Sequence, residues 1–121
     1  MFDADNLNST LIGLGVQERG TLFDQLDAAH KEPHRHYHTS DHISACLYAF
    51  DQVRELATRP TEIEIALWFH DSVYDTHRHD NEEKSSYWAW EYLLKAGVAE
   101  ESVKRIVEMI LIDSTSIKHQ N

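Results

Sequence analysis

The fold is decided by the stretch Leu67-Trp68-Phe69-His70-Asp71-Ser72-Val73-Tyr74-Asp75. A capping box, Thr61-Glu62-Ile63-Glu64, follows Pro60 and predicts that a helix begins at Thr61. Positions 63, 66, 67, 70 and 74 share one helical face, so His70 continues an apolar stripe. Residues 65–69 are apolar nearly all round the helix, which is typical of a central element. A buried imidazole beside a carboxylate needs hydrogen bonds or a metal, so the end of this helix predicts partners for both groups.

Length and charge exclude several classes of protein. A chain of 121 residues forms one domain with a real core. Its formal charge of −10 repels nucleic acid, but it leaves a small phosphorylated substrate possible. The longest apolar run is residues 65–69, and the amino end is acidic, so we expect no membrane span and no signal peptide. The lone Cys46 lies on an apolar helical stripe, which predicts a reduced core residue and a cytoplasmic protein.

The remaining patterns predict further helices. Residues 1–20 are polar or interrupted by glycine, so we expect a loosely structured lead-in, with the helical domain over 21–121. Amphipathic segments follow at 21–33, from about 40, at 81–96 and at 100–113. The segment at 81–96 follows Asp80, which is expected to cap it in a capping box with Glu83. The segment that starts near residue 40 has an apolar face of Ile43, Cys46, Leu47, Phe50 and Val53. The segment at 100–113 has an apolar face of Val103, Ile106, Val107, Ile110 and Leu111. No strand pattern is visible, so the prediction is an all-α, single-domain bundle of about five helices.

The groups able to bind a metal gather around two helix ends. His42 enters the first turn of the helix that starts near residue 40, beside its apolar face. His70 and Asp71 end the central helix, and the carboxylates of Asp75, Glu82 and Glu83 are near in sequence. Mixed imidazole and carboxylate ligands suit a divalent ion of manganese, iron, cobalt, nickel, zinc or magnesium.

Three segments of the chain carry a resemblance to a known family. They are Pro33-His34-Arg35-His36-Tyr37-His38 with His42-Ile43, then residues 66–75, and then Asp80-Asn81-Glu82-Glu83-Lys84-Ser85-Ser86. These segments resemble the HD-domain superfamily of metal-dependent phosphohydrolases, and in particular its small bacterial members. The resemblance covers the chain from about residue 20 and implies an all-helical HD-domain-like bundle. It also implies that His42, His70 and Asp71 are metal ligands.

The chemistry that the resemblance implies is hydrolysis of a phosphate ester or phosphoanhydride, with a nucleotide-like substrate. Glu82 or Asp75 is then the candidate to accept a proton from the attacking water. Arg35 is the first candidate for a phosphate clamp, because a guanidinium binds two oxygens at once. Lys84 is the second, and His38 is expected to support the substrate site without binding the metal.

Family members carry a last Asp ligand beyond a segment similar to residues 114–119, whereas this sequence ends at Asn121. Asp113 is the one late carboxylate on the final helix that is placed to substitute for it. The resemblance therefore predicts weak metal binding and low activity. It also predicts a homo-oligomer, because the apolar stripe of the final helix would be partly bare.

Two other classes of function remain open. The first is a regulatory module that keeps the bundle, and binds a metal or nucleotide without turning it over. The second is a structural protein whose helices dimerise. Metal content and the mass of the particle in solution separate these alternatives from an enzyme.

Overall fold

The computed structural model describes residues 2–17, 20–32, 40–74 and 80–120, and for 113–120 it describes the helical backbone but not the side chains. Its elements are α1 (Ala4–Gly13), α2 (Leu22–His30), α3 (Ser40–Asp51), the short 3₁₀ helix η1 (Arg54–Leu56), α4 (Pro60–Phe69), α5 (Asn81–Lys95) and α6 (Glu100–Gln120). The described residues contain no strand. The predicted all-α fold is therefore confirmed, with one α-helix more than expected.

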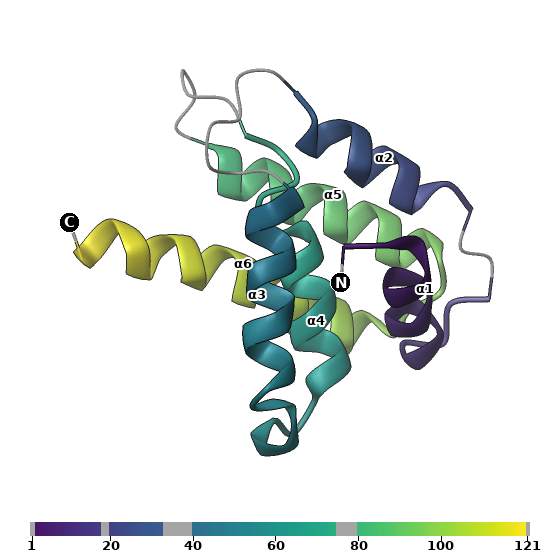
Figure 1. Ribbon diagram of the computed structural model, residues 1–121. Coiled ribbons are helices and arrows are strands. Elements are labelled where there is room, and N and C mark those ends of the chain that lie inside the picture. The colour runs from purple at the N-terminus through teal and green to yellow at the C-terminus, as the bar shows by residue number, and fades with distance from the viewer. Residues whose placement is uncertain (1, 18–19, 33–39, 75–79, 121) are drawn as a thin grey trace.

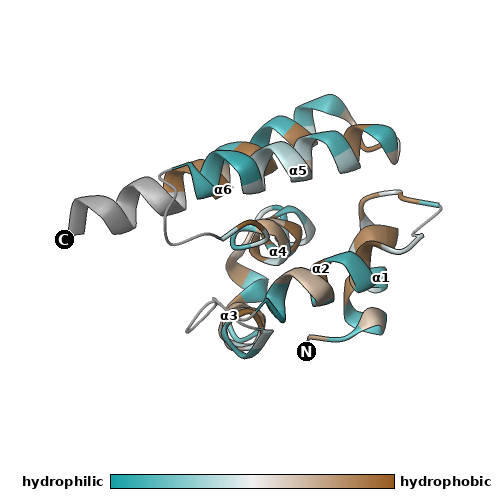
Figure 2. Ribbon diagram, turned by 90° about the horizontal axis from the view of Figure 1, so that it is seen from above, coloured by the Kyte–Doolittle hydropathy of each residue, from teal (hydrophilic) through white to brown (hydrophobic). Residues whose placement is uncertain are grey.

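Helix α4 is the centre of the bundle (Figure 1). It contacts α1, α3, α5 and α6. Seen from above, α5 and α6 lie side by side on one side of α4, while α3, α2 and α1 lie on the other (Figure 2). This arrangement explains why the middle of α4 is apolar nearly all round, as the sequence predicted.

Two adjacent aromatic residues of α4 fill the two sides of the core. Trp68 is fully buried and contacts Phe2 and Phe23, with ring centroids 5.0 and 6.2 Å away. Phe69 is also fully buried and packs on two aromatic rings of α5 on the opposite side. Burying each of these side chains stabilises the fold by about 1.5–3 kcal/mol.

The amino-terminal segment is helical, so the expectation of a loosely structured lead-in was wrong. The Asp3 side chain caps α1 by accepting a hydrogen bond from the Asn6 backbone N–H at 2.8 Å. Leu7 and Leu11, one turn apart, are both fully buried. The two leucines, at helical spacing, pack this helix on the core, and the cap fixes its start.

The predicted capping boxes do not form. Arg59 is the N-cap of α4 and Pro60 takes the first helical position, which places Thr61 inside the first turn. Thr61 packs instead against the end of α1, where a Cβ added to Gly13 would lie 3.0 Å from its methyl carbon. At α5, Asp80 is the N-cap but makes no side-chain capping hydrogen bond.

The ends of α3 and α4 also differ from their predicted faces. α3 ends at Asp51, and Val53, which was expected on its apolar face, lies beyond the helix and is exposed. α4 ends at Phe69 with His70 as its C-cap, so Tyr74 is not on the helical face counted from Ile63.

The apolar stripe of α6 is largely covered. The prediction that a partly bare stripe would drive self-association is therefore corrected. Val103, Ile106 and Ile110 are buried, because α6 packs on both α5 and α4. Val107 and Leu111 are half-buried. A bare stripe therefore does not support an oligomer, and the predicted homo-oligomer remains untested.

The first half of α4 carries two buried carboxylates, each paired with an arginine. Glu62 accepts two hydrogen bonds from Arg105 of α6, both at 2.8 Å. Glu64 forms an ion pair with Arg54 and accepts a hydrogen bond from Thr10 Oγ1 at 2.7 Å. These contacts tie α4 to α1, η1 and α6.

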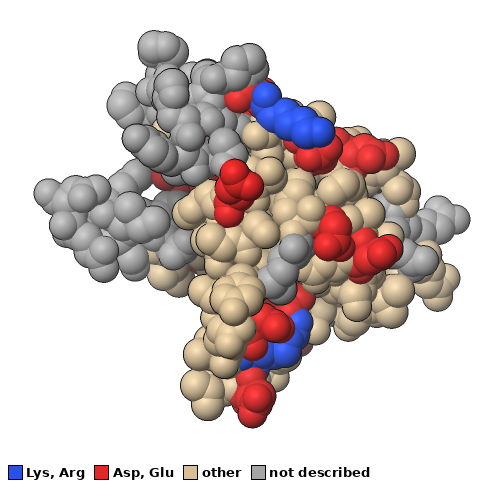
Figure 3. Space-filling model, in the orientation of Figure 1, with Lys and Arg blue, Asp and Glu red and all other residues tan. Residues whose placement is uncertain are grey.

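The surface carries much more negative than positive charge, in keeping with the composition. Acidic side chains are spread over the face seen in Figure 3, among few basic ones. None of the helices in the described part of the chain has the length and apolar character needed to cross a membrane.

Candidate metal centre

Helix α3 places two potential metal ligands on one face. His42 and Cys46 are one helical turn apart, so both side chains point the same way. Ile43 and Leu47 of the same helix are buried and fix its position on the bundle. The His42 side chain is 42% exposed and Cys46 is half-buried, so both are accessible from solution.

The end of α4 supplies the other two groups. The Nδ1 atom of His70 lies 2.6 Å from the Leu67 carbonyl oxygen. A carbonyl only accepts hydrogen bonds, so Nδ1 carries the proton and Nε2 carries the lone pair when the ring is neutral. A carbonyl partner of this kind commonly orients a metal-binding histidine. The side chains of His70 and Asp71 are only 13% and 17% exposed.

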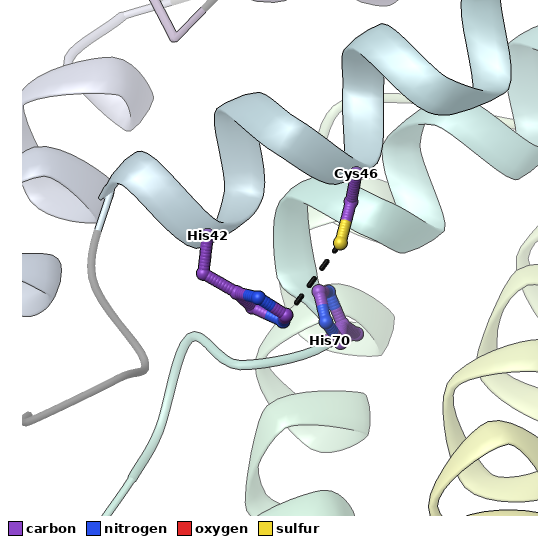
Figure 4. Close-up of side chains that lie close together, drawn as sticks. All are labelled: His42, Cys46 and His70. Carbon is purple, nitrogen blue, oxygen red and sulfur yellow. Dashed lines mark hydrogen bonds between the residues drawn. The ribbon is translucent and has the colours of Figure 1, made fainter.

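Asp71 and Cys46 each lie near both imidazoles. Asp71 Oδ2 lies 3.6 Å from His42 Nε2 and 3.5 Å from His70 Nε2. Cys46 Sγ lies 3.8 Å from His42 Nε2. The ligand atoms of His42, Cys46 and His70 are all within 4.8 Å of one another. Figure 4 shows the first two reaching from α3 toward the imidazole at the end of α4.

These separations fit a shared ion. Ligand atoms bonded at ~2.0–2.3 Å to a tetrahedral zinc ion lie roughly 3.3–3.8 Å apart. The His70–Asp71, His42–Asp71 and His42–Cys46 distances of 3.5, 3.6 and 3.8 Å, three of the six pairs among the four donor atoms, fall in that range. Donor type and spacing therefore both suit a divalent metal ion.

A hydrogen-bonded clamp holds the segment after Asp71. The Val73 backbone N–H donates to Ser85 Oγ at 3.0 Å, and the same hydroxyl donates to the Val73 carbonyl at 3.3 Å. Ser85 is fully buried on α5. The clamp fixes the turn that carries Asp71 against α5.

The other predicted site residues are placed as follows. Glu82 is half-buried and Lys84 is exposed, both near the start of α5. Arg35, His38 and Asp75 lie outside the described residues. Asp113 lies on α6, but its side chain is not described.

Two contacts of this site differ from what the sequence predicted. Cys46 was interpreted as a core residue, although its spacing from His42 already placed the two on one face. The clamp by Ser85 joins residues on different elements, and no local pattern indicates that contact.

An apolar cavity of about 330 Å³ adjoins the cluster. Its lining comprises Ile63, Ala66, Leu67, His70, Met109, Ile110 and Ile112. The predicted face of α4 therefore forms one wall of a cavity shared with α6. The imidazole of His70 borders both the cavity and the ligand cluster.

We compared the chain with protein-family models, with curated proteins and with solved structures, and none of them matched.

Proposed function

We propose that this protein is a metal-dependent phosphohydrolase whose ion is held by His42, His70 and Asp71. The convergence of both imidazole Nε2 atoms on one Asp71 oxygen, at 3.6 and 3.5 Å, is the observation that carries the proposal. The resemblance of these residues to the HD-domain pattern supports it. The acidic surface also supports it, because a negative field raises the local concentration of divalent cations.

Each protein group has a role in the proposed reaction. A bound divalent ion would polarise a phosphoryl oxygen and acidify a water molecule. The hydrogen bond from His70 to Leu67 and the clamp on Val73 keep the ligands oriented. Glu82 or Asp75 accepts the proton of the water, and Arg35 or Lys84, with His38 in support, binds the phosphate.

The cavity beside His70 is the proposed binding site for the organic part of the substrate. Its walls are aliphatic side chains and one methionine, with His70 as the titratable group. Such walls favour an apolar group, because the polar edge of a nucleobase would lose hydrogen bonds to water there. An aryl or alkyl phosphate therefore suits this wall better than the nucleotide expected from the resemblance.

The test compares the parent protein with His70→Ala after loading with zinc, cobalt, manganese or magnesium. We expect the parent to retain metal by elemental analysis and to hydrolyse aryl phosphates more slowly than the ~1–1,000 per second typical of enzymes, in keeping with the low activity that the resemblance predicts. His70→Ala should lose both properties. Tyr48→Ala, an exposed position on α3, is the matched control and should keep both. Equal metal content and activity in His70→Ala would refute the proposal.

The second candidate function is a metal-binding module without turnover. The approach of Cys46 to both imidazoles favours it, because a thiolate added to His42, His70 and Asp71 would give a tetrahedral ion four protein ligands and exclude substrate. Metal retention that depends on His70, with no hydrolysis of aryl, alkyl or nucleotide phosphates, would select this function over the first.

A further inference from the structure

Cys46 lies beside His42 and His70, although the sequence predicted it to be a core residue. Its Sγ lies 3.8 Å from His42 Nε2, and its ligand atom is within 4.8 Å of that of His70. Both imidazoles are thus close to one thiol as well as to one carboxylate.

Packing does not explain the position of Cys46. In the described part of the chain, the buried core includes Ile43 and Leu47 of α3 but not Cys46. The thiol instead lies on the side of the helix that faces His70 (Figure 4). Its neighbours there are imidazole rings, which share with thiolates a preference for zinc-like ions.

We propose that Cys46 is a ligand of the metal ion, as a thiolate, and that it makes the site selective for zinc and cobalt over magnesium and manganese. This inference rests on the metal site of the proposed function. A sulfur–metal bond replaces the sulfur–hydrogen bond, and the thiol proton leaves to solvent. Thiolate sulfur binds hard cations such as magnesium poorly, so the selectivity follows from the donor atom.

The arrangement remains compatible with catalysis. His42 and Cys46 chelate from one rigid helix, and His70 completes a set of three protein ligands. Three protein ligands leave one tetrahedral position for water or substrate, as in catalytic zinc sites. In this assignment Cys46 takes the place of Asp71 as the third ligand, and Asp71 Oδ2, near both imidazoles, would accept a hydrogen bond from a water molecule in the open position.

Cobalt titration of the intact protein tests this assignment. A thiolate bound to cobalt gives an intense charge-transfer band in the near ultraviolet, whereas imidazole and carboxylate ligands do not. We expect this band in the parent protein and its loss in Cys46→Ser and Cys46→Ala. Zinc affinity should fall at least ~10-fold in both variants, while the weak binding of magnesium should change little.

Ser44→Ala, a half-buried position on the same helix, is the control and should keep the band and the affinity. Circular dichroism establishes that each variant is folded. Cobalt binding by the parent without the band would overturn the role of Cys46 and leave the proposed function standing. Failure of the parent to bind any divalent ion would overturn both.

Discussion

The two ends of α4 handle their polar groups in different ways. At the amino end, the buried carboxylates of Glu62 and Glu64 are neutralised by arginines from α6 and η1. At the carboxyl end, His70 and Asp71 lie opposite His42. The atoms that face one another there, two imidazole nitrogens and a carboxylate oxygen, are all potential metal ligands.

The two ends of α4 obtain their positive charge from different sources. Arg54 and Arg105 supply the amino end from within the chain, so that end is a structural ion-pair network. The carboxyl end brings together the donor types that bind transition metals. In the proposed function its cation comes from solution. Stability should therefore depend more on the first end, and metal binding only on the second.

The largest expected effect is that of Arg54→Met on stability. The substitution removes the arginine partner of the buried Glu64 carboxylate. The hydrogen bond from Thr10 Oγ1 to Glu64 remains. Breaking a buried pair typically costs 3–5 kcal/mol, and the 38% exposure of Arg54 reduces that to about 2–3 kcal/mol. Urea unfolding monitored by circular dichroism measures the loss.

Lys95→Met is the matched control, because Lys95 pairs with Glu91 on the exposed surface of α5. It should change the unfolding free energy by less than about 0.5 kcal/mol. If Arg54→Met proves as mild as this control, the amino end is not the structural half of the helix. Zinc affinity should be the same in Arg54→Met as in the parent.

Local patterns account for much of this architecture. The apolar circumference of α4 predicted its central position, and the stripe of α6 predicted its buried face. The approach of His42 to His70 and Asp71 was also expected from the sequence, although their proposed role as ligands is untested. The first two features were predictable because each depends on periodicity within a single helix, whereas the approach of His42 to His70 and Asp71 was expected from the resemblance to the HD-domain pattern.

Other features depend on contacts between distant residues. The sequence gives no sign that Thr10 reaches Glu64 or that Arg105 reaches Glu62, because each pair spans several elements. Thr61 looked like a cap, but Pro60 displaced it into the helix, where it packs on Gly13. Tertiary packing decided the two side-chain pairs, whereas the position of Thr61 follows from the local preference of Pro60 for the first helical position.

A smaller effect is expected when the clamp at the carboxyl end is removed. Ser85→Ala leaves the Val73 N–H and carbonyl without the hydroxyl that bonds both. We expect a loss of about 1–2 kcal/mol in unfolding free energy. The turn carrying Asp71 should loosen, with a fall of about 10-fold in zinc affinity measured by calorimetry.

Ser86→Ala is a closely matched control, because Ser86 is also buried but its hydroxyl donates only within α5, to the Glu83 carbonyl at 2.8 Å. It should leave zinc affinity unchanged. Equal affinities in both serine variants would mean that the clamp does not orient the site.

The acid dependence of stability at the amino end gives a further test of its ion pairs. Hydrogen bonds from the Arg105 side chain lower the pKa of Glu62 below its ordinary value of 4.5, against the opposing effect of burial. A carboxylate whose folded pKa is depressed adds stability that is fully present above the unfolded pKa and is lost as the pH falls through the folded pKa. The parent should therefore lose this contribution progressively below about pH 4.5.

Arg105→Met tests this dependence, because it removes the hydrogen bonds that depress the pKa of Glu62. We expect unfolding free energies of the parent and the variant to differ most at neutral pH and to converge in acid, as measured by urea unfolding at a series of pH values. Lys104→Met, which removes an exposed cation one position earlier on α6, should instead run parallel to the parent. A constant difference between Arg105→Met and the parent down to pH values well below 4.5 would show that Arg105 contributes by packing alone. The amino end would then owe its stability to shape rather than charge, and the contrast with the donor cluster at the other end of α4 would rest on Arg54 and Glu64 only.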